Sequence, residues 1–297
     1  AHPASMSAMQ KWANNPRRNH IRVEHNDDSG SVDEQAYIEK LTSDVRIVSI
    51  VHTSPVTGMT VDLEKITKEV RNVTPDCIII VDGIQHSSHG AIDVQKYDID
   101  GYVVSPYKMF SRHGYGVAWA SERLCALNKE QLADGPFQNW ELGTRDAGSY
   151  ATFSDVVDYL DWLGSNFTES ENTRERLEAS SIAIKSHEQE LVDLVINGAE
   201  DIVGLRNNKK IRIIGNSAST SREGVVSFFH KNKPSRIIVE ELRQRKIRVH
   251  IRKDDHYCGN ILRPLNQKDC IRFSICHYNS KAEVVEFMKA INEISAN

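Results

Sequence analysis

The 297-residue chain is poor in cysteine and has no long apolar run. Its five cysteines, at positions 77, 125, 258, 270 and 276, form no Cys-x-x-Cys pair. An odd number without a pairing motif argues against a disulfide framework and favours reduced thiols, as in a cytoplasmic protein. No apolar run approaches the roughly 20 residues that a membrane-spanning helix needs. We therefore expect a cytoplasmic protein without a membrane partner.

An excess of basic residues is also lacking. The 37 lysines and arginines are outnumbered by 41 aspartates and glutamates, which gives a net charge of −4. Nucleic-acid-binding surfaces are usually strongly basic, so we expect no nucleic-acid partner. No GxGxxG or GxxxxGK[ST] loop follows a predicted strand, so a nucleotide-binding α/β protein is the weakest of the interpretations that remain. We assign no metal ligands.

The first hundred residues alternate between strand and helix patterns. Apolar or alternating runs predict strands at 21–24, 45–52, 77–81 and 101–105, and helical spacing predicts helices at 5–14, 33–41 and 61–72. Buried strands separated by helices imply a mostly parallel sheet that is covered on both faces. Ligands gather at the carboxyl ends of the strands in such sheets. His52, Asp82, Gln85, Ser105 and Lys108 would lie at that edge.

The second half has a different texture. Long helices are predicted at 153–163 and 174–196, followed by strands at 210–214, 224–229, 248–252 and 270–276 and helices at 235–245 and 281–294. These shorter elements predict a smaller α+β unit. We expect a large domain over residues 1–165, a connecting helix over 166–204 and a small C-terminal domain over 205–297.

The turn Asp82-Gly83-Ile84-Gln85 directly follows the buried run CIIIV. An aspartate at this place can point its carboxylate at a ring nitrogen and keep that nitrogen protonated, as the pyridine ring of pyridoxal phosphate requires. Gln85 could donate to the phenolic oxygen of the same ring. Taken alone, Asp82 would be interpreted as a turn-capping residue.

Lys108 ends the next buried run, three residues after Ser105. A lysine that forms a Schiff base must supply a neutral amine, which partial burial beside other cations favours. Ser105 and Tyr107 offer hydroxyl groups for a phosphate, and Arg112 and His113 add positive charge that would lower the lysine pKa. Taken alone, Lys108 would be interpreted as a solvent-exposed lysine at the end of a strand.

Together the two motifs resemble the core of the class V aminotransferase family, which includes cysteine desulfurases and selenocysteine lyases. Residues 81–116, VDGIQHSSHGAIDVQKYDIDGYVVSPYKMFSRHGYG, carry the Asp-x-x-Gln and Ser-x-x-Lys motifs in register. The resemblance implies a pyridoxal-phosphate-dependent transferase-like α/β fold, a cofactor held by Lys108 as an internal aldimine, and a homodimer. It also implies an amino acid or amine substrate, with Lys108 acting as general base at the substrate Cα.

The resemblance implies roles for four further residues. His2 occupies the place of the histidine that stacks on the cofactor ring, and Thr144 that of a threonine whose hydroxyl reaches the phosphate across the dimer interface. Arg272 resembles the arginine that binds the substrate carboxylate, a task that a bidentate guanidinium suits. Cys258 lies near the position where desulfurases carry their sulfur-accepting cysteine, and neighbouring His256 could help to form its thiolate.

The chain also departs from the family pattern. Pro55 replaces an asparagine, and Tyr107 replaces the histidine that often precedes the lysine. The family's segment upstream of the ring-stacking histidine has no counterpart, so we expect the large domain to be N-terminally incomplete. The reaction stays open between a cysteine desulfurase-like lyase or transferase and a class V aminotransferase or epimerase without sulfur chemistry. A truncated or inactive relative that does not hold the cofactor is a further alternative.

Overall fold

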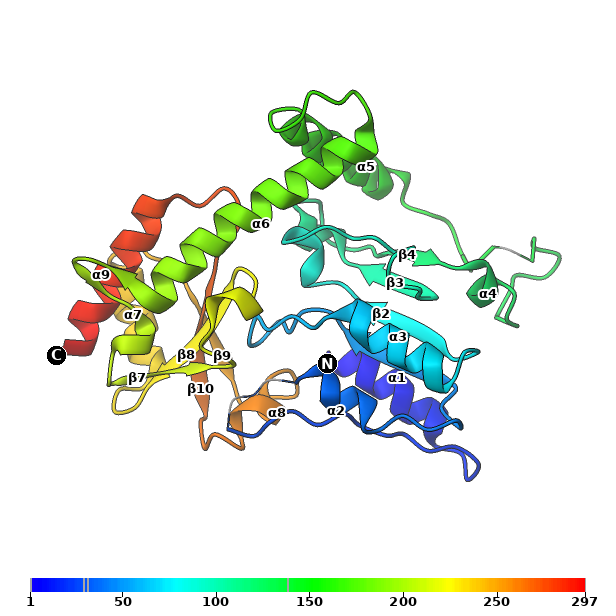
Figure 1. Ribbon diagram of the computed structural model, residues 1–297, viewed down its shortest axis with the longest axis horizontal. Coiled ribbons are helices and arrows are strands. Elements are labelled where there is room, and N and C mark those ends of the chain that lie inside the picture. Colours follow the sequence, from blue (N-terminus) through cyan, green and yellow to red (C-terminus); the bar gives the residue numbers. More distant parts are fainter. Residues whose placement is uncertain (1, 29, 31, 138, 297) are drawn as a thin grey trace. The chain divides into compact units, whose positions relative to one another are not determined.

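A computed structural model describes residues 2–28, 30, 32–137 and 139–296 (Figure 1). The chain divides into two compact units. The parallel-sheet unit comprises Leu41–His52 and Leu63–Ala183, and the antiparallel-sheet unit comprises Ala1–Lys40, Thr53–Asp62 and Ile184–Asn297. Domain boundaries near residues 165 and 205 stay a prediction.

The parallel-sheet unit contains a four-stranded sheet in the order β1-β2-β3-β4. Its strands are β1 (Ile47–Val51), β2 (Ile78–Asp82), β3 (Gly101–Val104) and β4 (Val117–Ala120). β1, β2 and β3 are parallel, whereas β4 pairs antiparallel with β3. The three apolar runs thus form the mostly parallel sheet that the sequence predicted.

Helices surround this sheet in the same unit. They are α3 (Leu63–Val73), η1 (His86–Ser88), η2 (Pro106–Met109), α4 (Glu122–Cys125), α5 (Ala147–Gly164) and the first part of α6 (Thr173–Asn197). α3 buries Leu63, Ile66 and Val70, whose spacing places them on one face of the helix. A Cβ at Gly164 would lie 1.9 Å from the carbonyl oxygen of Arg176, so the turn between α5 and α6 requires glycine there.

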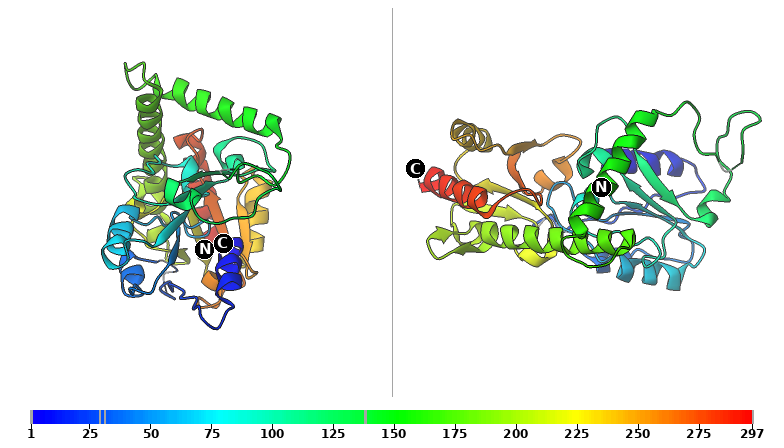
Figure 2. Two further views of the ribbon diagram at one scale, coloured as in Figure 1. Left: turned by 90° about the vertical axis from the view of Figure 1, so that its right-hand side faces the viewer. Right: turned by 90° about the horizontal axis from the view of Figure 1, so that it is seen from above.

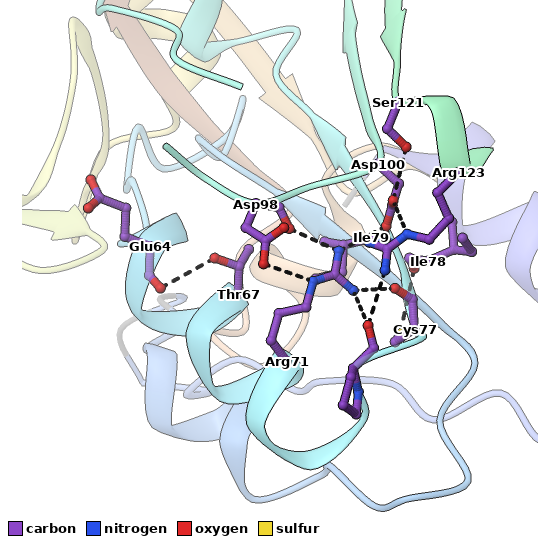
Figure 3. A network of polar contacts seen from close by, with 11 residues as sticks. Glu64, Thr67, Arg71, Cys77, Ile78, Ile79, Asp98, Asp100, Ser121 and Arg123 are labelled. Carbon is purple, nitrogen blue, oxygen red and sulfur yellow. Dashed lines mark hydrogen bonds and ion pairs between the residues drawn. The ribbon is translucent and has the colours of Figure 1, made fainter. Parts of the chain in front are cut away.

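A buried carboxylate joins several segments of this unit (Figure 3). Asp100 is 1% exposed and pairs with Arg71 on α3 (Oδ2 to Nη2, 3.0 Å) and with Arg123 on α4 (Oδ1 to Nε, 2.7 Å). It also accepts hydrogen bonds from the Ile79 amide (2.8 Å) and the Ser121 hydroxyl (3.0 Å). Burial alone would raise the pKa of Asp100, but these hydrogen bonds outweigh it and hold the pKa below its usual range.

The antiparallel-sheet unit contains the sheet β7-β8-β10-β9, in which all neighbours are antiparallel. The strands are β7 (Ile211–Ile214), β8 (Val225–His230), β9 (His250–Lys253) and β10 (Asp269–Ser274). Helices α7 (Ser235–Gln244) and α9 (Lys281–Ala296) pack with this sheet (Figures 1 and 2). Phe228 and Ile271 of the sheet join Leu242, Phe287 and Met288 of the helices in one apolar core.

Smaller elements complete this unit. They are α1 (Pro3–Ala13), α2 (Glu34–Ile38), the last part of α6, the ribbon of β5 (Gly198–Ala199) and β6 (Ile202–Val203), η3 (Leu205–Asn207), η4 (Ser219–Ser221) and α8 (Gly259–Leu262). The strand predicted at 21–24 is wrong, because residues 18–26 are irregular. Ile21 is half exposed, so this short run buries too little apolar surface to form a sheet strand. Within the described part of the chain, no helix has the length and hydropathy to cross a bilayer.

Candidate active site

The carboxyl ends of β1, β2 and β3 lie side by side, because these strands are parallel (Figure 1). His52 follows β1, Asp82 ends β2 and Ser105 follows β3. The His52 amide donates to the Asp82 carbonyl (3.0 Å), and the Gly83 amide donates to the carbonyl of Val103 (3.0 Å). The expected edge of polar residues is therefore present in the parallel-sheet unit.

Lys108 and Gln85 meet at this edge. Lys108 lies in η2, and its ammonium Nζ donates to Gln85 Oε1 at 3.0 Å. The Lys108 amide also donates to the Ser105 carbonyl (2.9 Å), which closes the turn. Gln85 is only 8% exposed. Two motifs that lie 23 residues apart in the sequence thus contribute side chains to one partly buried hydrogen bond.

Asp82 caps the turn that follows β2. Its Oδ1 accepts a hydrogen bond from the Ile84 amide (3.2 Å), as a turn-capping aspartate does. Asp82 also ends β2, which lies between β1 and β3 in the sheet. Ser105 and Lys108 follow β3. A structural role in the turn and a role toward a ligand are therefore compatible.

Gly83 is required by its neighbour Tyr102. A Cβ at Gly83 would lie 2.1 Å from the Tyr102 ring. That close approach holds Tyr102 against the turn, and its hydroxyl lies 3.0 Å from His52 Nδ1. The His52 ring in turn stacks on His86, with 3.6 Å between the ring centroids.

Two histidines near the site, His86 and His89, had no predicted role. His86 Nε2 lies 3.1 Å from the Ala91 carbonyl oxygen, so this nitrogen must be the donor. His89 Nε2 lies 3.1 Å from Gln85 Nε2. The His-x-x-His spacing around the short η1 turn was the available signal, but only the folded turn shows that both rings are buried.

The residues that flank Lys108 are more exposed. Tyr107 is 41% exposed, and its ring stacks on His113 at a centroid distance of 4.3 Å. Arg112 pairs with Asp146 at 3.4 Å. The Asp146 carboxylate partly compensates the charge of Arg112, and an effect of Arg112 and His113 on the Lys108 pKa stays a prediction.

Thr144 lies in the exposed loop that precedes α5. Its neighbours Glu141 and Arg145 form an ion pair across it. Contact of its hydroxyl with a phosphate stays a prediction.

The other candidate residues belong to the antiparallel-sheet unit. His2 caps the N-terminus of α1, where its Nδ1 accepts a hydrogen bond from the Ala4 amide (3.1 Å). Its ring lies 5.4 Å from that of Tyr257, which lies 4.1 Å from that of His256. His2 therefore lies beside the loop that carries Cys258.

Arg272 lies within β10, which overlaps the strand predicted at 270–276. In the register of the sheet, Arg272 lies opposite His250 on β9 and opposite Ser227 on β8. Its Nη1 donates to the Pro55 carbonyl (3.0 Å). Side chains alternate along a strand, so His250 and Arg252 lie on the same face as Arg272. Burial, followed by the charges of these two arginines, lowers the pKa of His250. This sheet face is cationic.

Cys258 is 1% exposed and packs in an apolar cluster with Phe229, Leu262 and Cys270. Burial is the largest cause that raises the pKa of its thiol. Reactive cysteines are usually partly exposed and have a lowered pKa, so the observed environment is that of a packed cysteine. Its role as a sulfur acceptor stays a prediction. Among the described residues, no group of three or more histidine, cysteine or acidic side chains is placed to hold a metal ion.

Several known proteins are similar to this chain in sequence. The chain is 26% identical to the aminotransferase-like protein FGM3 of Gibberella zeae over 263 residues, or 86% of this chain and 60% of that protein. It is 23% identical to a probable cysteine desulfurase of Pseudomonas putida, over 98% of this chain and 69% of the relative. A third relative, a cysteine desulfurase of Wigglesworthia glossinidia, is covered over 62% of its length. The chain thus spans about two thirds or less of each relative.

Solved structures share the fold. The apo cysteine desulfurase of Thermococcus onnurineus superposes with a TM-score of 0.79 at 20% identity, over 100% of this chain and 71% of that one. The Escherichia coli cysteine desulfurase CsdA gives a TM-score of 0.75 at 21% identity, over 99% and 69% of the two chains. These likenesses confirm the predicted α/β, pyridoxal-phosphate-dependent transferase-like fold. The model of the aminotransferase class-V family matches residues 1–287, and the chain belongs to that family.

Proposed function

We propose that the chain is part of a pyridoxal-phosphate-dependent enzyme that acts on an amino acid or amine, and that Lys108 forms the Schiff base with the cofactor. The observation that carries the proposal is the partly buried hydrogen bond between Lys108 Nζ and Gln85 Oε1, on the sheet edge that also bears Asp82. When bound, the cofactor supplies an electron sink for the substrate Cα.

The donor set of the parallel-sheet unit fits this cofactor. Lys108 supplies the amine for its aldehyde, Asp82 a carboxylate for its ring nitrogen, Gln85 an amide for its phenolic oxygen, and Ser105 and Tyr107 hydroxyls for its phosphate. All five follow the ends of β2 and β3. We further propose His2 for stacking on the ring and Thr144 for the phosphate, as family membership suggests.

The chain's own residues would handle the substrate and its proton. Lys108, once released as a free amine, is the base placed to take a proton from the substrate Cα. Gln85 holds Nζ in position through the observed hydrogen bond. Arg272 is proposed to bind the substrate carboxylate, because its guanidinium can form two parallel hydrogen bonds with it.

Cysteine desulfuration is the proposed reaction, supported by similarity to relatives described as cysteine desulfurases. One observation favours a second candidate, a class V aminotransferase or epimerase without sulfur chemistry. The burial of Cys258 raises its thiol pKa and opposes formation of the nucleophilic thiolate. The product formed from cysteine separates the two candidates. Desulfuration yields alanine and leaves the sulfur as a persulfide on an acceptor thiol, from which an added thiol reductant releases sulfide, whereas transamination requires an added keto acid.

Lys108 is tested by mixing the full-length protein with pyridoxal phosphate, reducing with borohydride and mapping the labelled peptide. We expect a visible absorbance band before reduction and a label on Lys108 afterwards. Lys108→Ala should lose both. Lys96→Ala is the matched control, since Lys96 is exposed and paired with Glu64 at 2.7 Å in the same unit. A label on another lysine in the wild type contradicts the assignment, and the absence of any band favours a relative that does not hold the cofactor.

We also propose that the enzyme is a homodimer. Apolar side chains of the parallel-sheet unit are about half exposed in the single chain, among them Phe137, Trp140 and Leu142. They lie close in sequence to Thr144, whose proposed phosphate contact crosses the dimer interface. Sedimentation of the cofactor-loaded, full-length protein as a monomer would contradict this.

A further inference from the structure

The side chains of Lys108, Gln85 and His89 form a row in which Lys108 is partly buried and the other two are buried. Lys108 Nζ donates to Gln85 Oε1 at 3.0 Å, and Gln85 Nε2 lies 3.1 Å from His89 Nε2. Gln85 is 8% exposed and His89 is 3% exposed, so water has little access to the two inner members. At these two contacts the donors and acceptors that face each other must therefore match, whatever else each side chain contacts.

The amide of Gln85 has one accepting end and one donating end. A lysine ammonium can only donate, so a charged Lys108 requires the oxygen of Gln85 on its side. The NH2 group of Gln85 then faces His89, and His89 Nε2 must accept. A charged Lys108 thus demands a neutral His89 whose proton is on Nδ1.

The opposite arrangement follows from the same rule. A doubly protonated His89 can only donate, so the Gln85 amide must turn and present its oxygen to His89. Its NH2 group then faces Lys108, which can accept only as a neutral amine. If Lys108 and His89 were both charged, the Gln85 amide could present its oxygen to only one of them. Its NH2 group would then face the other donor, and such an unsatisfied contact is costly where it is buried.

We propose that His89 is a positioning residue that acts on Lys108 through the Gln85 amide, so that a proton on His89 favours the neutral amine of Lys108. The inference rests on the proposed function in one respect: the neutral amine is the form that attacks a carbonyl and accepts a proton. Other ionisable side chains lie on the segments that adjoin the row: His52, His86, Tyr97 and Tyr102 contact one another, Asp82 ends β2, and Arg112 and His113 follow Lys108 in the sequence.

Linkage makes the coupling measurable from either end. The experiment uses the full-length, cofactor-free protein with 15N-labelled histidine, and NMR reports the tautomer and the pKa of His89. We expect the Nδ1–H tautomer in the wild type. Lys108→Met removes the charged donor and should raise the proton affinity of His89 by about tenfold or more. Lys96→Met, the control at an exposed lysine of the same unit, should leave His89 unchanged.

A double-mutant cycle separates the amide from simple charge repulsion. Loss of the Lys108 charge would raise the His89 proton affinity to some extent even without Gln85. The coupling through the amide should vanish in Gln85→Leu, where Lys108→Met then has a much smaller effect. Equal shifts in the two backgrounds, or an Nε2–H tautomer in the wild type, would overturn the proposal.

A second variant covers the case in which Gln85→Leu fails to fold. Gln85→Glu has nearly the same shape but offers acceptors at both ends, so Lys108 and His89 can be charged together. We expect His89 in Gln85→Glu to bind its proton more tightly than in the wild type, and an unchanged or lower affinity would contradict the coupling. Because these measurements need no cofactor, a positive result together with a failed borohydride label would reject the proposed function and keep the coupling.

Discussion

Replacement of Asp100 by alanine should destabilise the parallel-sheet unit by about 3–5 kcal/mol, the usual cost of removing one partner from a buried ion pair. Figure 3 shows why the carboxylate matters: it connects α3, β2 and the segment that follows β4. The loss should fall in the lower half of that range, because both arginines keep other partners. Arg71 still bonds Asp98, and Arg123 still donates to the Pro75 carbonyl (3.1 Å).

The Ile79 amide depends on the same carboxylate. Its hydrogen bond to Asp100 Oδ2 is lost in the alanine variant, and an unsatisfied buried amide costs about 1–3 kcal/mol. Weakened pairing of Arg123 adds the remainder. Asp100→Asn keeps one oxygen for Ile79 or for an arginine, so its loss of stability should be smaller than that of Asp100→Ala.

Urea unfolding followed by tryptophan fluorescence measures the change. Three of the four tryptophans, Trp119, Trp140 and Trp162, belong to this unit. Glu240→Gln is the control, because Glu240 and Arg243 form an exposed pair within α7 and such pairs contribute little. If Asp100→Ala unfolds at the same urea concentration as this control, the network does not stabilise the unit.

The pH dependence has a definite sign. The folded pKa of Asp100 lies below its usual range, so its carboxylate contributes stability above its unfolded pKa of about 4. This contribution should disappear as the pH falls through the lower folded pKa. Asp100→Asn should therefore differ most from the wild type near neutral pH and converge with it in acid, and a difference that stays constant down to acid pH would contradict the ion-pair explanation.

Three further predictions concern the candidate site. Iodoacetamide should label native Cys258 much more slowly than the partly exposed Cys125, and the two labelling rates should become equal after unfolding. Rapid labelling of Cys258 in the native protein would support a role as nucleophile. Arg272→Lys should weaken amino-acid binding by roughly 10- to 150-fold with cofactor absorbance unchanged, and coincident titrations would leave Arg272 a structural role only. Gly83→Ala should displace Tyr102 and reduce cofactor uptake, and unaltered uptake would show that the turn tolerates a Cβ.

Much of the site's framework was predictable because buried strands leave strong patterns. The runs ending at His52, Asp82 and Ser105 are apolar, and their alternation with helices implies parallel pairing. Parallel strands bring their carboxyl ends to one edge, which places Asp82 near Lys108 without any knowledge of side-chain contacts. The run at 21–24 failed because short alternation alone does not show that a partner strand exists.

The remaining features depend on contacts between residues far apart in the sequence. Cys258 has polar neighbours in the sequence, and its burial comes from Phe229 and Cys270 on two strands. The row of Lys108, Gln85 and His89 depends on the path of two short turns, and no period in the sequence encodes that path. Hydrogen-bond partners in irregular segments are fixed by packing, which composition and spacing do not reveal.

The shared fold and the individual residues answer different questions about the reaction. A shared fold at about 20% identity establishes the sheet edge, and that edge can support several reactions at a substrate Cα. The residues discriminate further: in the roles proposed above, Lys108 and Asp82 would serve any of these reactions, whereas Cys258 matters only if sulfur is transferred to the protein. Because Cys258 is buried, sulfur transfer requires either an opening of its loop or a different acceptor. The cationic side chains of Arg272 and Arg252 can attract a carboxylate without such an opening, so substrate binding and sulfur acceptance are separate questions in this chain.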